Sequence, residues 1–214
     1  MSGDIYSSFD LAFRYFNSEF FDGILPDCVF TLQRIWRVKG YFAGLRFLFP
    51  EGERSEIAVN PSYFGVLSDE EILSTLVHEM CHLHQFVIGK KSSEGYHSVS
   101  WADDMERCGL CPSSTGKPGG KKTGYRITQY IPDGSFFLGH CRKLESEGFS
   151  ISFKDKVTDE GVMLDVSGNT RVRNGLSGKR VCYSCQCGCR VWGKGGLSLS
   201  CKKCGGDFLP VVIN

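Results

Sequence analysis

The segment His78-Glu79-Met80-Cys81-His82 constrains this chain most, because its spacing fits a helix that carries a metal site. Two histidines four residues apart lie on one face of a helix, where both imidazoles can face a single Zn²⁺. Glu79 is the type of side chain that takes a proton from the water that attacks a peptide bond. The pattern therefore predicts a catalytic zinc with His78 and His82 as ligands and Glu79 as the general base.

The residues around this segment predict a buried helix over residues 69 to about 87. Ser68 suits the N-cap position, and Glu71, three residues later, completes a capping box. Apolar residues then surround the two histidines on most sides: Ile72, Leu73, Leu76, Val77, Met80 and Leu83. Buried polar side chains lose free energy unless they have partners, and a metal ion would be such a partner.

A catalytic zinc usually has three protein ligands and one open position. Beyond the motif, the chain has three more histidines, His84, His97 and His140. His84 lies two residues from His82 and faces away from it on a helix, so we expect it to pack elsewhere. His97 follows a polar loop that can return the chain to the first helix. We therefore expect His97 to be the third ligand, with Glu94 and His140 as the alternatives.

These features resemble the SprT-like metalloprotease family, which includes the Spartan-type DNA–protein crosslink proteases. Ordered segments over residues 4–110 carry the resemblance: Phe21-Asp22-Gly23-Ile24-Leu25-Pro26, Gly40-Tyr41-Phe42, Ile57-Ala58-Val59-Asn60-Pro61, the zinc motif and Glu94-Gly95-Tyr96-His97. One difference is Tyr96, where the better-known members have glycine. The resemblance implies a zincin-like fold, peptidase activity and His97 as a zinc ligand.

The spacing of apolar residues indicates an α+β domain in residues 1–111. Apolar positions repeat with helical spacing over residues 5–20. Apolar and polar residues alternate over residues 28–32 and in parts of 41–49 and 54–59, as is typical of short strands. We therefore predict helices packed on a short sheet. Its edge would border the zinc cleft, where an extended substrate can add as a strand.

Composition changes after this domain. Residues 112–124 are rich in Gly, Ser, Pro and Lys, which predicts a linker or mobile loop. Residues 125–180 contain short alternating stretches separated by turn residues, which predict a small β-rich module. The expected strands are 125–131, 149–153, 162–166 and 170–173. Residues 181–214 form the last predicted region, a zinc ribbon.

Six of the 11 cysteines lie in this last region. Two pairs of thiols separated by a short hairpin fit one tetrahedral structural zinc. Spacing alone favours Cys182 with Cys185 as the first pair. The ribbons of SprT-like proteins instead carry Tyr-x-Cys, Cys-Gly, Trp-Gly-Lys and Cys-x-x-Cys. That order implies the ligands Cys185, Cys187, Cys201 and Cys204, with Cys182 in reserve.

The odd number of cysteines and the lack of a secretory signal favour a reducing compartment. We therefore expect a protein of the cytoplasm, associated with the nucleoid, or of the nucleus, and not a secreted one.

Charge differs between the two halves. Residues 1–116 contain 9 Lys and Arg against 16 Asp and Glu, whereas residues 117–214 contain 16 against 8. A basic half beside an acidic catalytic half favours contact with nucleic acid. The candidate phosphate contacts are Arg171, Arg173, Lys179, Arg180, Arg190, Lys194, Lys202 and Lys203. Tyr183 and Trp192 are candidates for stacking on unpaired bases. The alternative is a solvated basic surface with both aromatic rings packed inside.

Together these patterns predict a monomeric zinc endopeptidase that cleaves proteins bound or crosslinked to DNA. It would hold one catalytic and one structural Zn²⁺ and bind DNA with single-stranded features. The sequence contains no apolar span, so we expect no membrane partner. Tyr125 or Tyr130 are possible oxyanion donors, although no sequence signal places them there. Two alternatives remain: a non-catalytic zinc protein that binds nucleic acid or regulates, and a protease dedicated to one protein partner. Glu79 argues against the first, because a structural site needs no general base.

Overall fold

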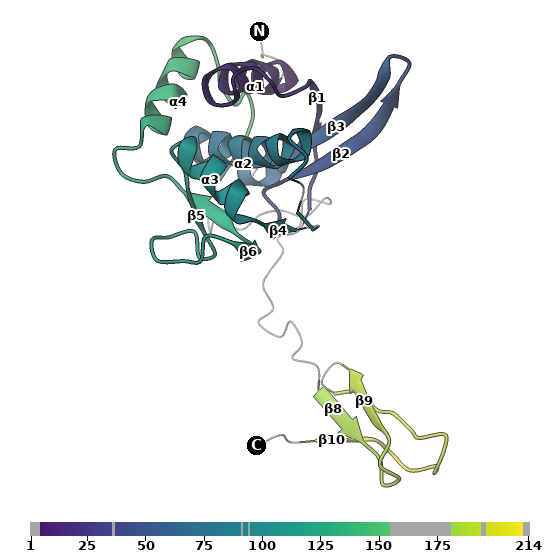
Figure 1. Cartoon of the computed structure of the whole chain (residues 1–214). Coiled ribbons are helices and arrows are strands. Elements are labelled where there is room, and N and C mark those ends of the chain that lie inside the picture. The colour runs from purple at the N-terminus through teal and green to yellow at the C-terminus, as the bar shows by residue number, and fades with distance from the viewer. Residues whose placement is uncertain are drawn as a thin grey trace. The chain divides into compact units, whose positions relative to one another are not determined.

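The computed structural model in Figure 1 describes residues 5–35, 37–90, 92–93, 95–154, 181–193 and 196–211. The chain divides into two compact units, Met1–Leu164 and Asp165–Asn214. The expected strands at residues 162–166 and 170–173 lie outside the described residues.

The first unit begins with helix α1 (Ile5–Phe21), which covers the core with one apolar face. Its buried residues are Ile5, Phe9, Ala12, Phe13, Phe16, Phe20 and Phe21. They recur every three or four positions and so lie on the same side of the helix. The Asn17 side chain fixes the turn that follows, since its amide donates to the Leu25 carbonyl (2.9 Å) and accepts from the Leu25 N–H (3.1 Å).

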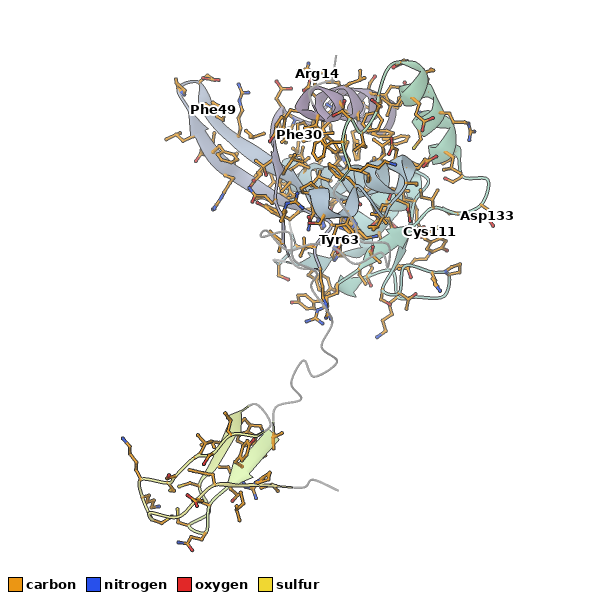
Figure 2. All side chains as sticks on the ribbon, turned by 180° about the vertical axis from the view of Figure 1, so that it is seen from behind. Arg14, Phe30, Phe49, Tyr63, Cys111 and Asp133 are labelled. Carbon is orange, nitrogen blue, oxygen red and sulfur yellow. The ribbon has the colours of Figure 1, made fainter. Side chains whose placement is uncertain are left out.

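A three-stranded sheet follows, built from β1 (Cys28–Leu32), β2 (Gly40–Phe49) and β3 (Gly52–Val59). The spatial order is β1-β3-β2, with β1 parallel and β2 antiparallel to β3. The far end of the β2–β3 hairpin extends away from the helices (Figure 1). Phe30 of β1 packs against Phe13 of α1, with ring centroids 5.6 Å apart, and Figure 2 shows it beside that helix.

Helix α2 (Asp69–Val87) runs through the middle of the first unit, and its predicted bounds are confirmed. The capping box is present, because the Glu71 N–H donates to the Ser68 hydroxyl and the Glu71 carboxylate accepts from the Ser68 N–H (2.9 Å). Twelve of its residues are buried, including those on both sides of the histidines. The short helix η1 (Pro61–Tyr63) links the sheet to α2, and α3 (Val99–Arg107) packs beside α2.

Within the first unit, the segment after α3 folds back to pair with strand β4 (Tyr96–His97) and forms a second short strand pair. Strand β4 pairs with β6 (Gly124–Tyr125), and β5 (Cys111–Ser113) pairs with β7 (Thr128–Tyr130). Between β5 and β6 the chain is held by internal hydrogen bonds, such as the Ser113 hydroxyl to the Lys117 carbonyl (2.6 Å). This differs from the sequence prediction, in which residues 112–124 are a linker or mobile loop and residues 125–180 form a module of their own.

Helix α4 (Phe136–Ser146) is a second difference from the predicted β-rich module. It buries Phe137, Cys141 and Leu144, and the Phe137 ring stacks on Phe16 of α1 with centroids 5.6 Å apart. Residues 149–153 form no strand; Phe149 and Ile151 instead bury their side chains in the same core. Alternation of apolar residues was a poor guide here, because tertiary contacts with α1 decide which side chains are buried.

The second unit contains an antiparallel sheet of β8 (Val181–Ser184), β9 (Arg190–Gly193) and β10 (Leu209–Pro210), in the order β10-β8-β9. Two tight turns that carry cysteines lie beside this sheet. Among the described residues of the whole chain, every helix is too short or too polar to cross a lipid bilayer.

Candidate active site and cysteine cluster

Three histidines converge in the first unit. His78 and His82 lie one turn apart on α2, and β4 brings His97 to the same point, so that their ligand atoms all lie within 4.8 Å of one another. Nε2 of His78 is 3.2 Å from Nε2 of His97. Two Zn–N bonds of about 2.0–2.1 Å at a tetrahedral angle place their nitrogens about 3.3 Å apart. The donor set and its spacing therefore fit a zinc ion.

Burial keeps the three imidazoles neutral. It lowers the pKa of His78 well below the ordinary value, an effect increased by His82 and His97. Burial and then the neighbouring His97 lower the pKa of His82 to about 3, and burial also lowers the pKa of His97. A histidine binds a metal through the lone pair of its neutral form. At neutral pH these side chains are therefore in the form that binds a metal.

Glu79 lies beside the triad with only 5% of its surface exposed. Burial raises the pKa of its carboxyl group to about 8. The beginning of β2 packs directly against it, because a Cβ added to Gly40 would lie 3.3 Å from Oε1 of Glu79. A general base works best when its pKa is near the working pH. Gly40, the first residue of an edge strand, thus lies beside Glu79, whose pKa suits a general base at neutral pH.

Trp101 forms one wall of the histidine site, a role that the sequence analysis did not assign to it. Its side chain is 1% exposed, and its ring centroid lies 4.3 Å from that of His97, 4.7 Å from His78 and 5.3 Å from His82. Ser98 caps α3 by accepting from the Trp101 N–H (3.2 Å), so the helix begins immediately after His97. The chain therefore supplies a candidate ligand and the ring that packs on it within five residues.

The second ring nitrogens of two histidines have partners from beyond β5. His78 Nδ1 lies 2.9 Å from Oε1 of Gln129 on β7, and His97 Nδ1 lies 3.1 Å from the carbonyl oxygen of Gly124 on β6. These contacts direct Nε2 of each ring toward the centre of the triad. The sequence analysis missed both partners, since no local pattern distinguishes a glutamine or a glycine carbonyl as support for a histidine.

The other candidates of the first unit lie elsewhere or make other contacts. His84 binds the Asp104 carboxylate (2.6 Å), as expected for a packing residue. His140, an alternative third ligand, instead binds the Tyr15 hydroxyl (Nδ1 to oxygen, 2.7 Å) and lies outside the histidine group. Glu94 lies outside the described residues. Tyr130 hydrogen-bonds Cys111, its partner on β5, whereas Tyr125 is 64% exposed and pairs across the strands with Tyr96.

In the second unit, four sulfurs gather within 4.8 Å of one another: those of Cys185, Cys187, Cys189 and Cys201. The Sγ atom of Cys187 lies 3.0 Å from Cys185, 3.6 Å from Cys189 and 3.7 Å from Cys201. Three of the four expected ligands are therefore together. Cys189 stands in this group where Cys204 was expected, and the reserve residue Cys182 is buried on β8 outside it. Four thiols in this arrangement are suited to a structural zinc.

The two cysteine turns close with similar hydrogen bonds, although the second turn is one residue longer, and this similarity argues for Cys204. Gly188 N–H donates to the Cys185 carbonyl (2.9 Å), as Gly205 N–H does to Cys201 (2.8 Å), and both glycines have positive φ, 82° and 71°. Cys187 and Cys204 each precede the glycine, so they hold equivalent positions. The N–H groups of Cys204 and Lys203 lower the pKa of Cys201 to about 6, which favours a thiolate. Distance thus favours Cys189 as the fourth ligand and turn geometry favours Cys204.

The predicted nucleic-acid contacts are only partly within the described residues. Arg190 and Trp192 alternate on β9, so they share one face, and Trp192 is 59% exposed. Lys202 and Lys203 are exposed in the second cysteine turn. The remaining basic candidates lie outside the described residues: Arg171, Arg173, Lys179, Arg180 and Lys194.

The prediction that Tyr183 stacks on unpaired bases was wrong. The Tyr183 ring is 2% exposed and its hydroxyl accepts the Leu197 N–H (3.1 Å). The ring is part of the interior of the second unit, so it has no free face for a base.

Comparison with known proteins bears on the first unit. No curated protein and no solved structure matches this chain. The model of the SprT-like family matches residues 10–123, more than half of the chain. The matched region contains the three histidines, Glu79 and Trp101, and it ends just before β6. The chain therefore belongs to the SprT-like family.

Proposed function

We propose that this protein is a zinc-dependent endopeptidase that cleaves proteins bound or crosslinked to DNA. The observation that carries the proposal is the convergence of His78, His82 and His97 beside the buried Glu79. Membership of the SprT-like family suggests a metalloprotease-like function and so supports the same chemistry. A buried carboxyl group next to three neutral imidazoles has no evident purpose in a purely structural metal site.

Each residue of the site has a role in this proposal. Zinc, when bound, would supply the Lewis acidity that activates water and polarises a peptide carbonyl. Glu79 accepts the proton of the attacking water and then gives it to the leaving amine, a double role that a pKa near neutrality allows. Trp101 covers the histidine rings and keeps water away from that side.

The outer edge of β2, which pairs with no further strand among the described residues, is the proposed place for the substrate backbone. In the order β1-β3-β2, β2 is an edge strand, and Gly40 at its beginning lies against Glu79. An extended peptide can add to such an edge through main-chain hydrogen bonds, which select for unfolded segments more than for a sequence. A protease of low sequence selectivity then needs another source of specificity.

DNA binding by the second unit would be that source. Arg190 can contact a phosphate and the exposed Trp192 ring can stack on an unpaired base from the same face of β9. Two linked binding events raise the effective concentration of a DNA-bound substrate near the active site.

The test is a cleavage assay with the zinc-loaded full chain and a DNA-binding protein crosslinked to a single-stranded oligonucleotide. We expect cleavage that depends on DNA and falls by a factor of about 10²–10⁴ in the Glu79→Gln variant, the range for loss of a general base. Arg190→Ala with Trp192→Ala should reduce cleavage of the crosslinked substrate toward the low level seen with the DNA-free protein. Arg142→Ala, which removes an exposed arginine on α4, is the matched control.

The remaining outcomes contradict the proposal in different ways. Cleavage that ignores DNA and depends on one protein would indicate a protease dedicated to a partner. The lack of cleavage with zinc bound at both sites, together with salt-dependent DNA binding, would indicate a non-catalytic nucleic-acid-binding protein.

A further inference from the structure

Gln129 joins His78 to the first half of α2 through a chain of hydrogen bonds. Its Oε1 lies 2.9 Å from Nδ1 of His78, and its Nε2 donates to the Ser74 hydroxyl (3.0 Å). The Ser74 hydroxyl in turn donates to the Glu71 carbonyl (2.8 Å). Ser74 is buried and Gln129 is half-buried, so the middle of this chain of hydrogen bonds is largely shielded from bulk water.

This chain determines the orientation of the Gln129 amide. The only hydrogen of the Ser74 hydroxyl goes to the Glu71 carbonyl, so the hydroxyl can only accept from Gln129. The NH₂ group of Gln129 must therefore face Ser74, and its carbonyl oxygen must face His78. An amide oxygen only accepts, so Nδ1 of His78 carries the proton. The lone pair of His78 is then on Nε2, the atom that lies 3.2 Å from Nε2 of His97.

We propose that Gln129 is a positioning residue that fixes the tautomer and direction of the His78 imidazole for metal binding. The inference rests on the zinc site of the proposed function. Gln129 lies beyond residues 10–123, to which the family resemblance extends, so the metal site of this chain includes a side chain from outside the family region. The pairing of β7 with β5, in which Gln129 faces Pro112, holds it in place.

His97 provides a comparison within the same site. Its Nδ1 is held by the carbonyl of Gly124, a main-chain group that substitution of the side chain cannot remove. Gln129 is therefore the partner that mutagenesis can change without altering a ligand. Outer partners of this kind typically contribute 10–100-fold to metal affinity.

The test compares Gln129→Leu and Gln129→Glu in the full chain, with Gln33→Leu as the matched control because Gln33 is exposed after β1. Metal affinity is measured by chelator competition with zinc and by titration with cobalt(II), whose absorption separates imidazole ligands from thiolates. We expect Gln129→Leu to weaken binding at the histidine site about 10–100-fold and to leave the cysteine site unchanged. Gln129→Glu keeps an acceptor for the Nδ1 proton, so it should bind at least as tightly as wild type.

A merely structural role predicts a different pattern. Both Gln129 variants would then lower the melting temperature, and zinc affinity of the folded protein would not distinguish leucine from glutamate. Equal affinity of Gln129→Leu and wild type, or equal weakening by leucine and glutamate, would overturn the proposal. If Gln129→Leu fails to fold, Ser74→Ala replaces it: loss of the amide's anchor should weaken zinc binding, and unchanged affinity would equally overturn the proposal.

The metal-binding measurement is independent of peptide cleavage. A wild-type protein that binds zinc at the histidines but cleaves no substrate would refute the proposed function and leave the role of Gln129 intact. Cleavage with unchanged affinity in Gln129→Leu would do the reverse.

Discussion

Replacing Glu79 with glutamine should make the metal-free protein more stable at neutral pH, although it should abolish cleavage. The carboxyl group of Glu79 is 5% exposed, and burial alone raises its pKa from 4.5 to about 8. Between these two values the folded protein holds a proton that the unfolded chain has released. The free energy of unfolding therefore falls as pH rises through this window.

The size of the effect follows from the two pKa values. At pH 7 the difference corresponds to about 3 kcal/mol of lost stability in the wild type, changing by about 1.4 kcal/mol per pH unit within the window. Glutamine has the same shape and cannot ionise. Metal-free Glu79→Gln should thus exceed wild type by about 3 kcal/mol at pH 7 and differ little from it near pH 4.5.

The assay is urea unfolding of the chelator-treated full chain from pH 4.5 to 8, followed by tryptophan fluorescence, to which the buried Trp101 contributes. The two proteins differ only at residue 79, so the contributions of the histidines and cysteines cancel. Added zinc should flatten the pH dependence, because a nearby cation favours the ionised carboxylate. A stability difference that stays constant from pH 5 to 8 would refute the raised pKa, and with it the buried carboxyl as a base matched to neutral pH.

Three further substitutions test the surroundings of the site. Gly40→Ala places a Cβ 2.9 Å from the Ala58 carbonyl oxygen, a main-chain atom that cannot easily move away. The substitution should therefore lower the stability of the protein by about 1–3 kcal/mol and slow cleavage. An unchanged unfolding midpoint would contradict this contact. Trp101→Leu should lower the free energy of unfolding by about 3 kcal/mol and weaken zinc binding. Calorimetry checks the first effect and metal titration the second, and an unchanged value in either would contradict the expectation. Ser68→Ala removes the capping box and should cost about 1 kcal/mol without changing cleavage by the folded protein, so a large loss of activity at 25 °C would be unexpected.

Local sequence predicted α2 and the placement of its two histidines well. Helix spacing places His78 and His82 on one face, and the capping box defines where the helix begins, because these relations involve residues within one or two turns. The third histidine, His97, was inferred from the loop that precedes it and from the resemblance to the SprT-like family. The structure brings it to the other two.

The sequence by itself therefore predicted the helix that carries His78 and His82, and the two cysteine turns of the second unit. The tertiary structure alone decided what surrounds them. Gln129 reaches His78 across 51 residues of sequence, and Gly124 reaches His97 across 27. Strands of two or three residues, such as β4 and β6, exist only because distant partners supply their hydrogen bonds. Local periodicity records which face of an element is buried, but it does not record which distant residue covers that face.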